Sequence, residues 1–276
     1  MKILVTGANG FIGSYLSGHY RNLGYEVHAT SRDNLNPLDY YGVKDFFDKN
    51  SVDLVVHTAI TGGSRARPDT IQDLHNNIIM FNNLSLFRHR YGAMINFGSG
   101  AEFCRASSID NAPEEQVFDS YPSDYYGLSK NLITRKIVDL QDNIYNFRLF
   151  GCFGPKESER RLLRASYDKI SSGKPPTIHE DKYMDYFYVG DIPAVVDALL
   201  QESTEFPKDI NLCYGDKHKL SEILNLFLSL TNYEKHINII NKKGFSYTGS
   251  FDKLEKLDLG LKGLEAGIAE CLLAWE

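Results

Sequence analysis

The chain has few cysteines and no long apolar run, and these absences exclude several classes of protein. Its four cysteines, Cys104, Cys152, Cys213 and Cys271, lack the paired spacing of a zinc site or a redox dithiol. No run approaches 18 consecutive apolar residues, so no segment is long enough to span a bilayer as a helix. The N-terminal stretch lacks the apolar core of a signal peptide. We expect a cytoplasmic protein with reduced thiols, without a metal site and without a membrane partner.

An excess of positive charge is also absent. The 30 lysine and arginine residues are outnumbered by 36 aspartate and glutamate residues, which gives a formal net charge of −6. A dedicated nucleic-acid binder carries a basic surface that neutralises phosphates, so nucleic acid is not an expected partner. Hydrophobic residues make up 42% and charged residues 24% of the chain, as in an ordinary globular protein. Collagen-like and disordered classes are thereby excluded.

Short apolar segments alternate with helical patterns along the first 155 residues. Short segments rich in apolar residues predict strands at 2–6, 25–30, 52–57, 93–97 and 143–149. The nearly continuous apolar run at 52–57 is typical of a strand buried on both faces of a parallel sheet. Apolar residues at helical spacing predict helices at 11–23, 43–49, 69–90 and 123–140. This alternation predicts an α/β fold, a Rossmann-like doubly wound parallel sheet.

Beyond residue 155 the pattern is less regular. It predicts helices at 157–172, 192–201 and 220–230, a strand at 185–189 and a closing segment at 254–276. We therefore expect a nucleotide-binding Rossmann domain over 1–155 and a smaller mixed C-terminal lobe over 156–276. The lobe is expected mainly to bind substrate, with some of its segments returning to the sheet.

A glycine-rich turn joins the first predicted strand to the first predicted helix. Its first glycine permits a tight turn, its second lets backbone N–H groups approach a pyrophosphate, and its third lets helix and strand pack closely. The helix N-terminus adds the positive end of the helix dipole. A purely structural turn is the alternative, but the position at the first strand-to-helix junction favours a dinucleotide site. The expected contacts are Gly7, Asn9, Gly10, Phe11, Ile12 and Gly13.

The residues after the second predicted strand indicate which dinucleotide binds. NAD sites place an acidic side chain there, on the ribose 2′-hydroxyl, whereas NADP sites place a cation against the 2′-phosphate. Ser31 stands at the acidic position, and the guanidinium of Arg32 follows it. NADP is therefore the predicted cofactor. NAD is the alternative, in which Arg32 is a solvated loop residue and Asp33 holds the ribose.

Tyr126 and Lys130 lie four residues apart on one face of a predicted helix. Such pairs also arise by chance, and Tyr40 with Lys44 is a second one. Tyr126 differs because the preceding strand leads to Ser99, so a hydroxyl and a phenol can meet at the carboxyl edge of the sheet. Ketone reduction needs a proton for the developing alkoxide, which a phenol with a pKa lowered by an ammonium can deliver while a serine holds the oxygen. We predict that Ser99, Tyr126 and Lys130 are catalytic, with Lys130 also holding the cofactor ribose.

The chain resembles the extended short-chain dehydrogenase/reductases that act on nucleotide-activated sugars. Beside the features above, the resemblance rests on Val56-His57-Thr58-Ala59, Asn77, the stretch 146–155 and the stretch 185–191. It implies that Ser99, Tyr126 and Lys130 are catalytic and that the C-terminal lobe grips the sugar nucleotide. It further implies cofactor contacts at Thr58, Ala59, Asn77, Tyr126 and Lys130. Members of the group commonly form homodimers through two helices of each subunit, here those at 69–90 and 123–140.

The segment from Thr30 to Asp39 is similar to GDP-L-fucose synthase-like 4-keto sugar reductases, which implies that Asp39 lies near the adenine. The chain departs from that subfamily where reduction is coupled to epimerisation. Ala101 stands in place of a cysteine, and no histidine lies between Pro155 and His179. The acid and base for epimerisation are therefore expected to be absent.

Expected substrate contacts lie in two regions. The resemblance places them at Gly100, Ala101 and Gly151, where the group often has asparagine in place of Gly151. A basic segment is the second region, and its guanidinium groups suit a diphosphate, although a solvated helix face is the alternative. The arginines concerned are Arg160, Arg161 and Arg164.

Together these features predict NADPH-dependent reduction of a nucleotide-linked 4-keto-6-deoxy sugar in surface polysaccharide biosynthesis. The expected partner is a nucleotide-diphosphate sugar. A nucleotide-sugar 4-epimerase that keeps tightly bound NAD is the first alternative. A non-catalytic NADP-sensing protein is the second, although a sensor has no need of the proton donor that Ser99, Tyr126 and Lys130 supply.

Overall fold

The computed structural model describes residues 1–64, 67–140, 142–201, 206–233 and 236–276. Over this length the chain divides into two compact units. Unit 1 comprises Met1–Arg105, Glu114–Arg148 and Asp197–Ile210. Unit 2 comprises Ala106–Pro113, Leu149–Val196 and Asn211–Glu276. Unit 1 thus contains most of the first 148 residues, and the segment 197–210 also belongs to it.

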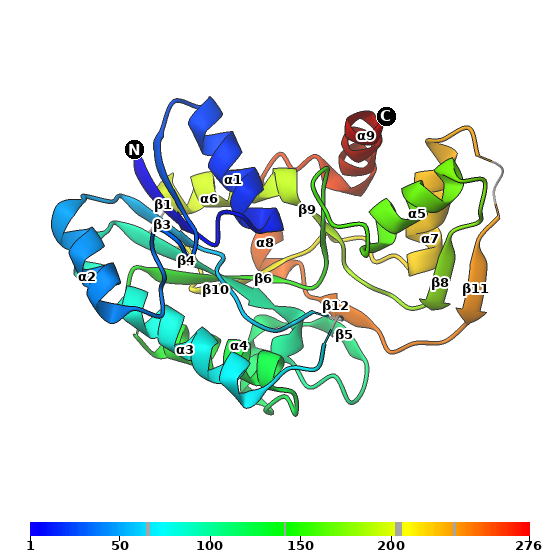
Figure 1. The fold of residues 1–276 in the computed structure, drawn as a ribbon. Coiled ribbons are helices and arrows are strands. Elements are labelled where there is room, and N and C mark those ends of the chain that lie inside the picture. Colours follow the sequence, from blue (N-terminus) through cyan, green and yellow to red (C-terminus); the bar gives the residue numbers. More distant parts are fainter. Residues whose placement is uncertain (65–66, 141, 202–205, 234–235) are drawn as a thin grey trace. The chain divides into compact units, whose positions relative to one another are not determined.

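A six-stranded sheet forms the centre of the fold, in the order β10-β6-β4-β3-β1-β2 (Figure 1). Its strands are β1 Lys2–Thr6, β2 Glu26–Thr30, β3 Leu54–His57, β4 Ala93–Ser99, β6 Ile144–Leu149 and β10 Asp209–Leu212. The pairs β1–β2, β1–β3 and β3–β4 are parallel. The chain crosses from β2 over β1 to reach β3, which is the reversal of strand order that defines a doubly wound sheet. The predicted Rossmann-like α/β class is confirmed.

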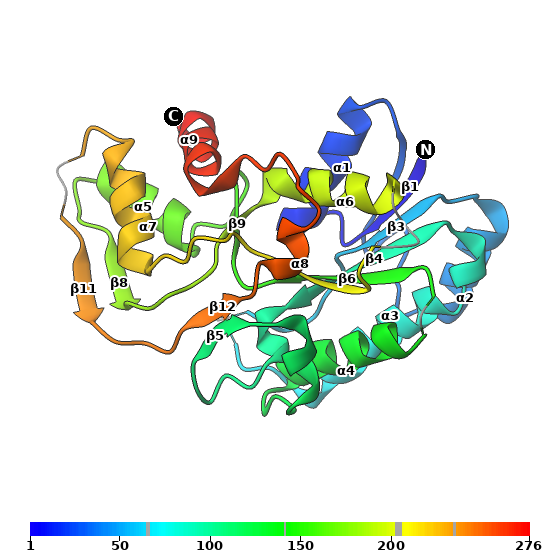
Figure 2. The same cartoon turned by 180° about the vertical axis from the view of Figure 1, so that it is seen from behind.

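Helices cover both faces of this sheet. They are α1 Phe11–Asn22, α2 Tyr40–Lys49, α3 Ile71–Ser85, α4 Tyr125–Leu140 and α6 Ile192–Gln201. The first face is covered by α2, α3 and α4, which share one apolar cluster that includes Phe47, Phe81 and Ile137 (Figure 1). The opposite face is covered by α1 and the part of α6 that begins at Asp197 (Figure 2). Short 3₁₀ helices are η1 Arg88–Arg90, η2 Gly100–Glu102, η3 Glu114–Phe118 and, in unit 2, η4 Val189–Asp191.

Capping explains where two of these helices begin. The Asp39 carboxylate accepts a hydrogen bond from the Tyr41 N–H at 3.0 Å, so α2 begins three residues before the predicted start. At the start of α3, Thr70 and Asp73 form a reciprocal capping box, in which the Thr70 N–H donates to Asp73 at 2.8 Å. The predicted helix at 69–90 is therefore shorter at both ends, because η1 replaces its last residues.

Unit 2 contains short strands and four further helices. They are β5 Ile109–Ala112, β7 Cys152–Phe153, β8 Thr177–Glu180, β9 Phe187–Tyr188, β11 Asn238–Asn241, β12 Tyr247–Gly249, α5 Leu162–Ser171, α7 Leu220–Ser229, α8 Asp252–Glu255 and α9 Gly263–Trp275. The strands pair in parallel as β8 with β11, β5 with β12 and β7 with β9. Strands of two to four residues are too short to show a clear periodic pattern. Among the strands of unit 2, the sequence therefore predicted only β9.

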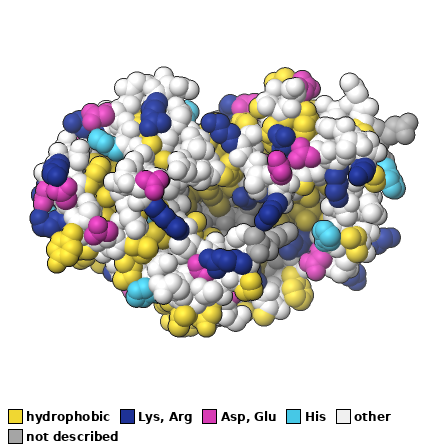
Figure 3. Space-filling model, viewed as in Figure 1, with side chains coloured by type: hydrophobic (Ala, Val, Ile, Leu, Met, Phe, Trp, Pro, Cys, Tyr) yellow, Lys and Arg dark blue, Asp and Glu magenta, His cyan; other side chains and the backbone are white. Residues whose placement is uncertain are grey.

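One face of the molecule carries charges of both signs (Figure 3). On the face drawn in Figure 3, acidic and basic side chains lie interspersed. Within the described ranges, no helix is long and apolar enough to cross a membrane. The same ranges contain no group of three or more histidine, cysteine, aspartate or glutamate side chains arranged to hold a metal ion.

Truncation of Phe47 is expected to destabilise unit 1 strongly. Phe47 is fully buried, and its ring stacks on Phe87 at a centroid distance of 5.4 Å. Phe47→Ala leaves a cavity between α2 and the sheet, so we expect the free energy of unfolding to fall by about 3 to 5 kcal/mol. Tyr41→Ala on the same helix is the control, because Tyr41 is 78% exposed. Urea unfolding checks both variants, and equal losses would contradict the assignment of Phe47 to the core.

Candidate active site

The turn between β1 and α1 packs so closely that Gly7 and Gly13 have no space for a side chain. Gly7 has a φ of +70°, and a Cβ there would lie 2.6 Å from the backbone nitrogen of Ala59. A Cβ on Gly13 would lie 2.6 Å from Thr58 Oγ1. Gly10 caps α1 without a side chain, and the first turn of the helix has no acidic residue to neutralise the positive end of its dipole. The turn that contains Gly7, Asn9, Gly10, Phe11, Ile12 and Gly13 therefore fits a dinucleotide pyrophosphate.

The segment after β2 folds into a turn held by its own polar groups. The Ser31 N–H donates to the Asn34 side chain at 2.7 Å. Arg32 is exposed and, with Asp33 and Asp39, lines a surface cavity of about 350 Å³. Asp39 is at the same time the N-cap of α2, so its position is fixed by the helix start. Arg32 and Asp39 thus lie at one cavity beside the tip of β2.

Thr58, which follows β3, and Asn77 on α3 hold the loop after β3 in place. The Thr58 hydroxyl donates to Thr6 O at 2.7 Å, which holds the end of β3 against the glycine turn. The Asn77 amide is fully engaged: it accepts from Thr61 N–H at 2.9 Å and donates to Thr61 O and to Ser129 Oγ, each at 3.0 Å. Asn77 therefore braces the loop against α4 in this structure.

Ser99 and Tyr126 meet at the carboxyl end of β4. Ser99 is the last residue of β4 and caps η2, where its hydroxyl accepts from the Ala101 N–H at 3.2 Å. Tyr126 lies in the first turn of α4, is half-buried, and lies close enough to the Ser99 side chain for Ser99 to lower its pKa. Gly63 covers the phenol ring, since a Cβ on Gly63 would lie 2.7 Å from it. The structure thus brings a hydroxyl and a phenol together at the sheet edge.

The pKa of the Tyr126 phenol is raised above its ordinary value. Burial is the largest cause, and the Ser99 side chain opposes it. The carboxylates of Glu102 and Asp69 raise the pKa further, while Arg105 lowers it. Tyr126 is therefore a protonated phenol at neutral pH, available as a proton donor.

Lys130 is directed toward the sheet. It is 6% exposed, and its Nζ donates to the carbonyl oxygen of Phe97 at 2.5 Å. Burial lowers the pKa of Lys130 to about 8, although Glu102 opposes this. In this structure the ammonium is bonded to β4, and burial is the largest influence on the phenol, so the lowering of the Tyr126 pKa by Lys130 stays a prediction.

His57 is buried at the end of β3. The sequence indicated this residue only as part of the stretch Val56-His57-Thr58-Ala59, which carries the family resemblance. Its Nδ1 lies 2.8 Å from the Thr6 hydroxyl. Burial, assisted by the charge of Lys130, lowers the pKa of His57 to about 3. The imidazole is therefore neutral at physiological pH and serves as a hydrogen-bonding element between β1 and β3.

The predicted substrate contacts lie in different units. In unit 1, Gly100 and Ala101 form η2 and are buried, and a Cβ on Gly127 would lie 2.4 Å from Ala101 O, so η2 packs tightly on α4. In unit 2, a Cβ on Gly151 would lie 2.6 Å from Asp185 O. Close backbone packing therefore explains why residue 151 is a glycine here, where the related group often has asparagine.

The arginines of unit 2 do not share one helix, which corrects the predicted helix at 157–172. Since α5 begins at Leu162, Arg160 and Arg161 precede it and only Arg164 lies on it. Arg164 is held by Asp168 at 3.0 Å and lies over the Trp275 ring. With Glu157, Ser158, Glu159 and Arg160, it lines a cavity of about 470 Å³.

Glu157 is a site residue that the sequence reasoning missed. Its Oε1 accepts from the Arg164 N–H at 2.8 Å, whereas its buried Oε2 makes no hydrogen bond within the described chain and lies 3.8 Å from Arg161 Nε. Burial raises the pKa of Glu157 to about 7, and the hydrogen bond and the two arginines only partly offset it. A single glutamate in such a segment gives no sequence signal, since its burial depends on how the loop folds.

The doubly wound sheet and the glycine turn define a dinucleotide-binding protein of the Rossmann type. The chain belongs to the NAD dependent epimerase/dehydratase family, whose model matches residues 3–213. The resemblance to enzymes of nucleotide-sugar metabolism is thereby confirmed.

Three known proteins illustrate this similarity. GDP-L-colitose synthase of Yersinia pseudotuberculosis is 20% identical and aligns over 85% of this chain and 83% of its own length. The structure of MlghC, a GDP-mannoheptose C4 reductase from Campylobacter jejuni with NADP bound, is similar at a TM-score of 0.82, with 18% identity over 99% of this chain and 98% of that one. A UDP-glucose 4-epimerase from Thermotoga maritima is similar at a TM-score of 0.76, with 21% identity over 100% and 98%.

Replacement of Glu157 by glutamine is expected to change how stability depends on pH. Because the pKa of Glu157 is about 7 in the folded chain and about 4.5 otherwise, the folded state binds more protons between these values and wild-type stability falls as pH rises through them. Glu157→Gln abolishes this loss while keeping the acceptor for the Arg164 N–H. We expect the variant to gain up to about 3 kcal/mol relative to wild type between pH 4.5 and pH 7.5. Denaturant unfolding at both pH values checks this, and a constant difference would contradict the raised pKa.

Proposed function

We propose that the protein is an NADPH-dependent reductase of a nucleotide-linked 4-keto-6-deoxy sugar. The observation that carries the proposal is the placement of Ser99 beside the protonated Tyr126 at the carboxyl end of β4, with Lys130 one helical turn further along α4. The similarity to a GDP-mannoheptose C4 reductase and to GDP-L-colitose synthase supports it. In this proposal the enzyme is a cytoplasmic homodimer that serves surface polysaccharide biosynthesis.

The proposed cofactor fits the residues present. The glycine turn leaves no room for a Cβ at Gly7 or Gly13, and this lets a pyrophosphate approach the backbone at the start of α1. The exposed guanidinium of Arg32 suits a 2′-phosphate, and Asp39 is proposed to lie near the adenine. When bound, NADPH supplies the hydride that reduces C4 of the sugar. Further proposed cofactor contacts are Thr58, Ala59 and Asn77.

Each side chain at the end of β4 has a distinct part in the proposed reaction. The Ser99 hydroxyl holds the C4 oxygen, and the Tyr126 phenol donates its proton to that oxygen as negative charge develops. Because an alkoxide is far more basic than a phenolate, this transfer remains favourable although the pKa of Tyr126 is raised. Lys130 is proposed to hold the cofactor ribose with its ammonium. Gly100, Ala101, Gly151, Arg160, Arg161 and Arg164 are the proposed substrate contacts.

Reduction without epimerisation is favoured by the side chain that follows the catalytic serine. Ala101 is 1% exposed and lies in η2, where it can neither give nor take a proton. Inversion at a carbon next to the ketone needs a base that removes its proton from one face of the ring and an acid that returns a proton to the other. We therefore propose that the product keeps the configuration of its substrate at the carbons next to C4.

A nucleotide-sugar 4-epimerase with tightly bound NAD is the second candidate, favoured by the similarity to the Thermotoga maritima epimerase. Its first half-reaction is an oxidation, for which Tyr126 has to act as a base. The raised pKa of Tyr126 opposes this role and favours the reductase. A non-catalytic NADP sensor would have no use for Tyr126 as a proton donor.

Replacement of Tyr126 tests the reductase directly. With a panel of nucleotide 4-keto sugars, we expect wild type to oxidise NADPH in proportion to the sugar reduced. Tyr126→Phe removes the proton donor, so kcat is expected to fall by about 10²- to 10⁴-fold while the dissociation constant of NADPH stays unchanged. Tyr125→Phe is the matched control, because the adjacent Tyr125 is 42% exposed. Absorbance at the NADPH band and fluorescence titration provide the two measurements.

Other outcomes of this assay separate the candidates. Sugar turnover without net NADPH oxidation, by protein that carries NAD, would establish the epimerase. NADPH binding with no oxidation by any sugar, and no effect of Tyr126→Phe, would establish the sensor. Either result contradicts the reductase.

Substitution of Gly63 tests the packing over the Tyr126 ring. Gly63 has a φ of +69°, so Gly63→Ala strains the backbone and also brings a Cβ to 2.7 Å from the ring. Gly24→Ala is the control, because Gly24 has a φ of +81° and open space around its Cβ position. We expect both variants to lose about 1 kcal/mol of stability, but only Gly63→Ala to lose about tenfold or more in kcat. Equal kcat values would show that Gly63 does not position Tyr126.

A further inference from the structure

The Glu102 carboxylate lies directly behind the proposed active site, although it cannot touch a substrate. Glu102 is fully buried at the end of η2, three residues after Ser99. Its Oε1 accepts from the Ser99 N–H at 2.8 Å. A Cβ on Gly98 would lie 2.4 Å from the same oxygen, so the backbone before Ser99 is also shaped around this carboxylate. Glu102 thus fixes the backbone that carries the Ser99 hydroxyl.

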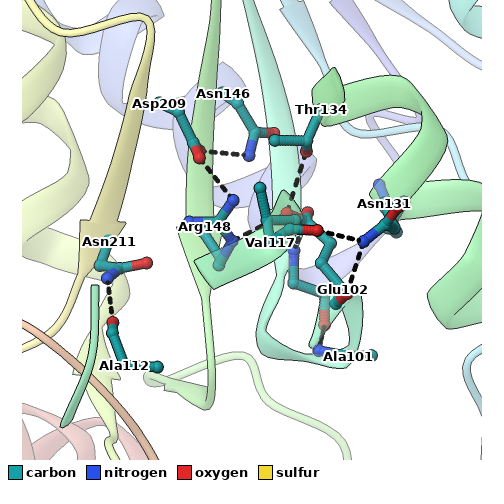
Figure 4. A network of polar contacts seen from close by, with 12 residues as sticks. Ala101, Glu102, Ala112, Val117, Asn131, Thr134, Asn146, Arg148, Asp209 and Asn211 are labelled. Carbon is teal, nitrogen blue, oxygen red and sulfur yellow. Dashed lines mark hydrogen bonds and ion pairs between the residues drawn. The ribbon is translucent and has the colours of Figure 1, made fainter. Parts of the chain in front are cut away.

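The same residue is attached to the helix that carries the tyrosine. The Thr134 hydroxyl on α4 donates to Glu102 Oε2 at 2.9 Å, and the Asn131 amide donates to the Glu102 carbonyl oxygen at 2.9 Å (Figure 4). Asn131 and Thr134 lie one and four residues after Lys130 on the same buried helix. One glutamate therefore connects the serine turn to the helix of Tyr126 and Lys130.

A buried arginine holds the carboxylate in place from the opposite side. Arg148 on β6 donates through Nε to Glu102 Oε2 at 2.7 Å and through a terminal nitrogen to Asp209 Oδ2 at 2.6 Å (Figure 4). Asn146 donates to the other oxygen of Asp209 at 2.8 Å. Asp209 lies on β10 and is thus a second carboxylate partner of Arg148 on another strand, which provides a natural control.

We propose that Glu102 is a positioning residue that sets the distance between the Ser99 hydroxyl and the Tyr126 phenol by bonding the serine turn and helix α4 at once. The proposal rests on the proposed reductase function. It assigns no contact with substrate or cofactor to Glu102.

The charge of Glu102 adds a signature that a purely structural role would not have. Its carboxylate raises the pKa of Tyr126 and the pKa of Lys130. Asp69 also raises the pKa of Tyr126 and Arg105 lowers it, while the neutral His57 lies near Lys130. Removal of the Glu102 charge therefore lowers both pKa values. Since the reduction needs Tyr126 and Lys130 protonated, the alkaline limb of activity moves to lower pH.

The experiment compares Glu102→Gln with Asp209→Asn, because each variant removes one carboxylate from Arg148. We expect both to unfold at lower temperature than wild type. Glu102→Gln is expected to reduce kcat by about 10- to 100-fold with an unchanged dissociation constant for NADPH, and to move the alkaline limb by about one pH unit. Asp209→Asn is expected to retain kcat within about threefold and to keep the wild-type limb. Equal kcat values for the two variants, or an unmoved limb in Glu102→Gln, would overturn the proposal.

Thr134→Val serves if Glu102→Gln does not fold. It removes the hydroxyl that joins α4 to Glu102 Oε2 but keeps the charge, so kcat is expected to fall by about 3- to 10-fold with the alkaline limb unmoved. Wild-type kcat in Thr134→Val would then overturn the proposal.

Failure of the reductase function is recognised separately. If wild type fails to oxidise NADPH with any of the sugars tested, an NMR titration still tests the role of Glu102. The protein is labelled with ¹³Cζ-tyrosine and saturated with NADP⁺. The Tyr126 signal is assigned with Tyr126→Phe. Its pKa is expected to fall in Glu102→Gln and to stay at the wild-type value in Asp209→Asn, and equal values in all three proteins would overturn the proposal.

Discussion

The buried positive charge of Arg148 is the constraint around which unit 1 is organised. Burial alone lowers the pKa of its guanidinium, but Asp209 and Glu102 more than offset this and raise that pKa, so the group stays charged. A charge without exposure to water needs partners on every side, and the Phe103 ring, 4.9 Å away, covers part of it. Because these partners come from β10 and η2, neutralising one arginine fixes where the turn that carries Ser99 can lie.

Backbone proximity is the second constraint, and it acts through glycines that tolerate no side chain. Gly7 brings the first turn against the end of β3, and Gly127 brings the first turn of α4 against η2. Gly63 places a loop on the Tyr126 ring. Each contact removes space in which a catalytic group could move. Such close packing suits the proposed reaction, which depends on the alignment of a hydride and a proton.

Local patterns in the sequence predicted the parts of the site that depend on short spacing. The glycine turn and the Tyr126/Lys130 pair are examples, because strand-to-helix order places both at one sheet edge. Glu102 and Arg148 could not be paired in this way, since 46 residues separate them and their contact depends on the order of strands. The sequence predicted Arg160 and Arg161 on a helix that begins only after them. The prediction was wrong there because positive charge does not indicate where a helix starts. The direction of Lys130 toward Phe97 also depends on a neighbouring strand.

The raised pKa of Tyr126 changes how the site is to be understood chemically. A phenol whose pKa is lowered by a neighbouring ammonium serves oxidation and reduction alike, because it can both give and take a proton near neutral pH. A phenol kept protonated by burial and by the carboxylates of Glu102 and Asp69 serves one direction better. It gives its proton readily to an alkoxide, yet it is costly to ionise before an alcohol can be oxidised. In the proposed reductase, this electrostatic setting favours transfer of the proton to a ketone oxygen over removal of a proton from an alcohol.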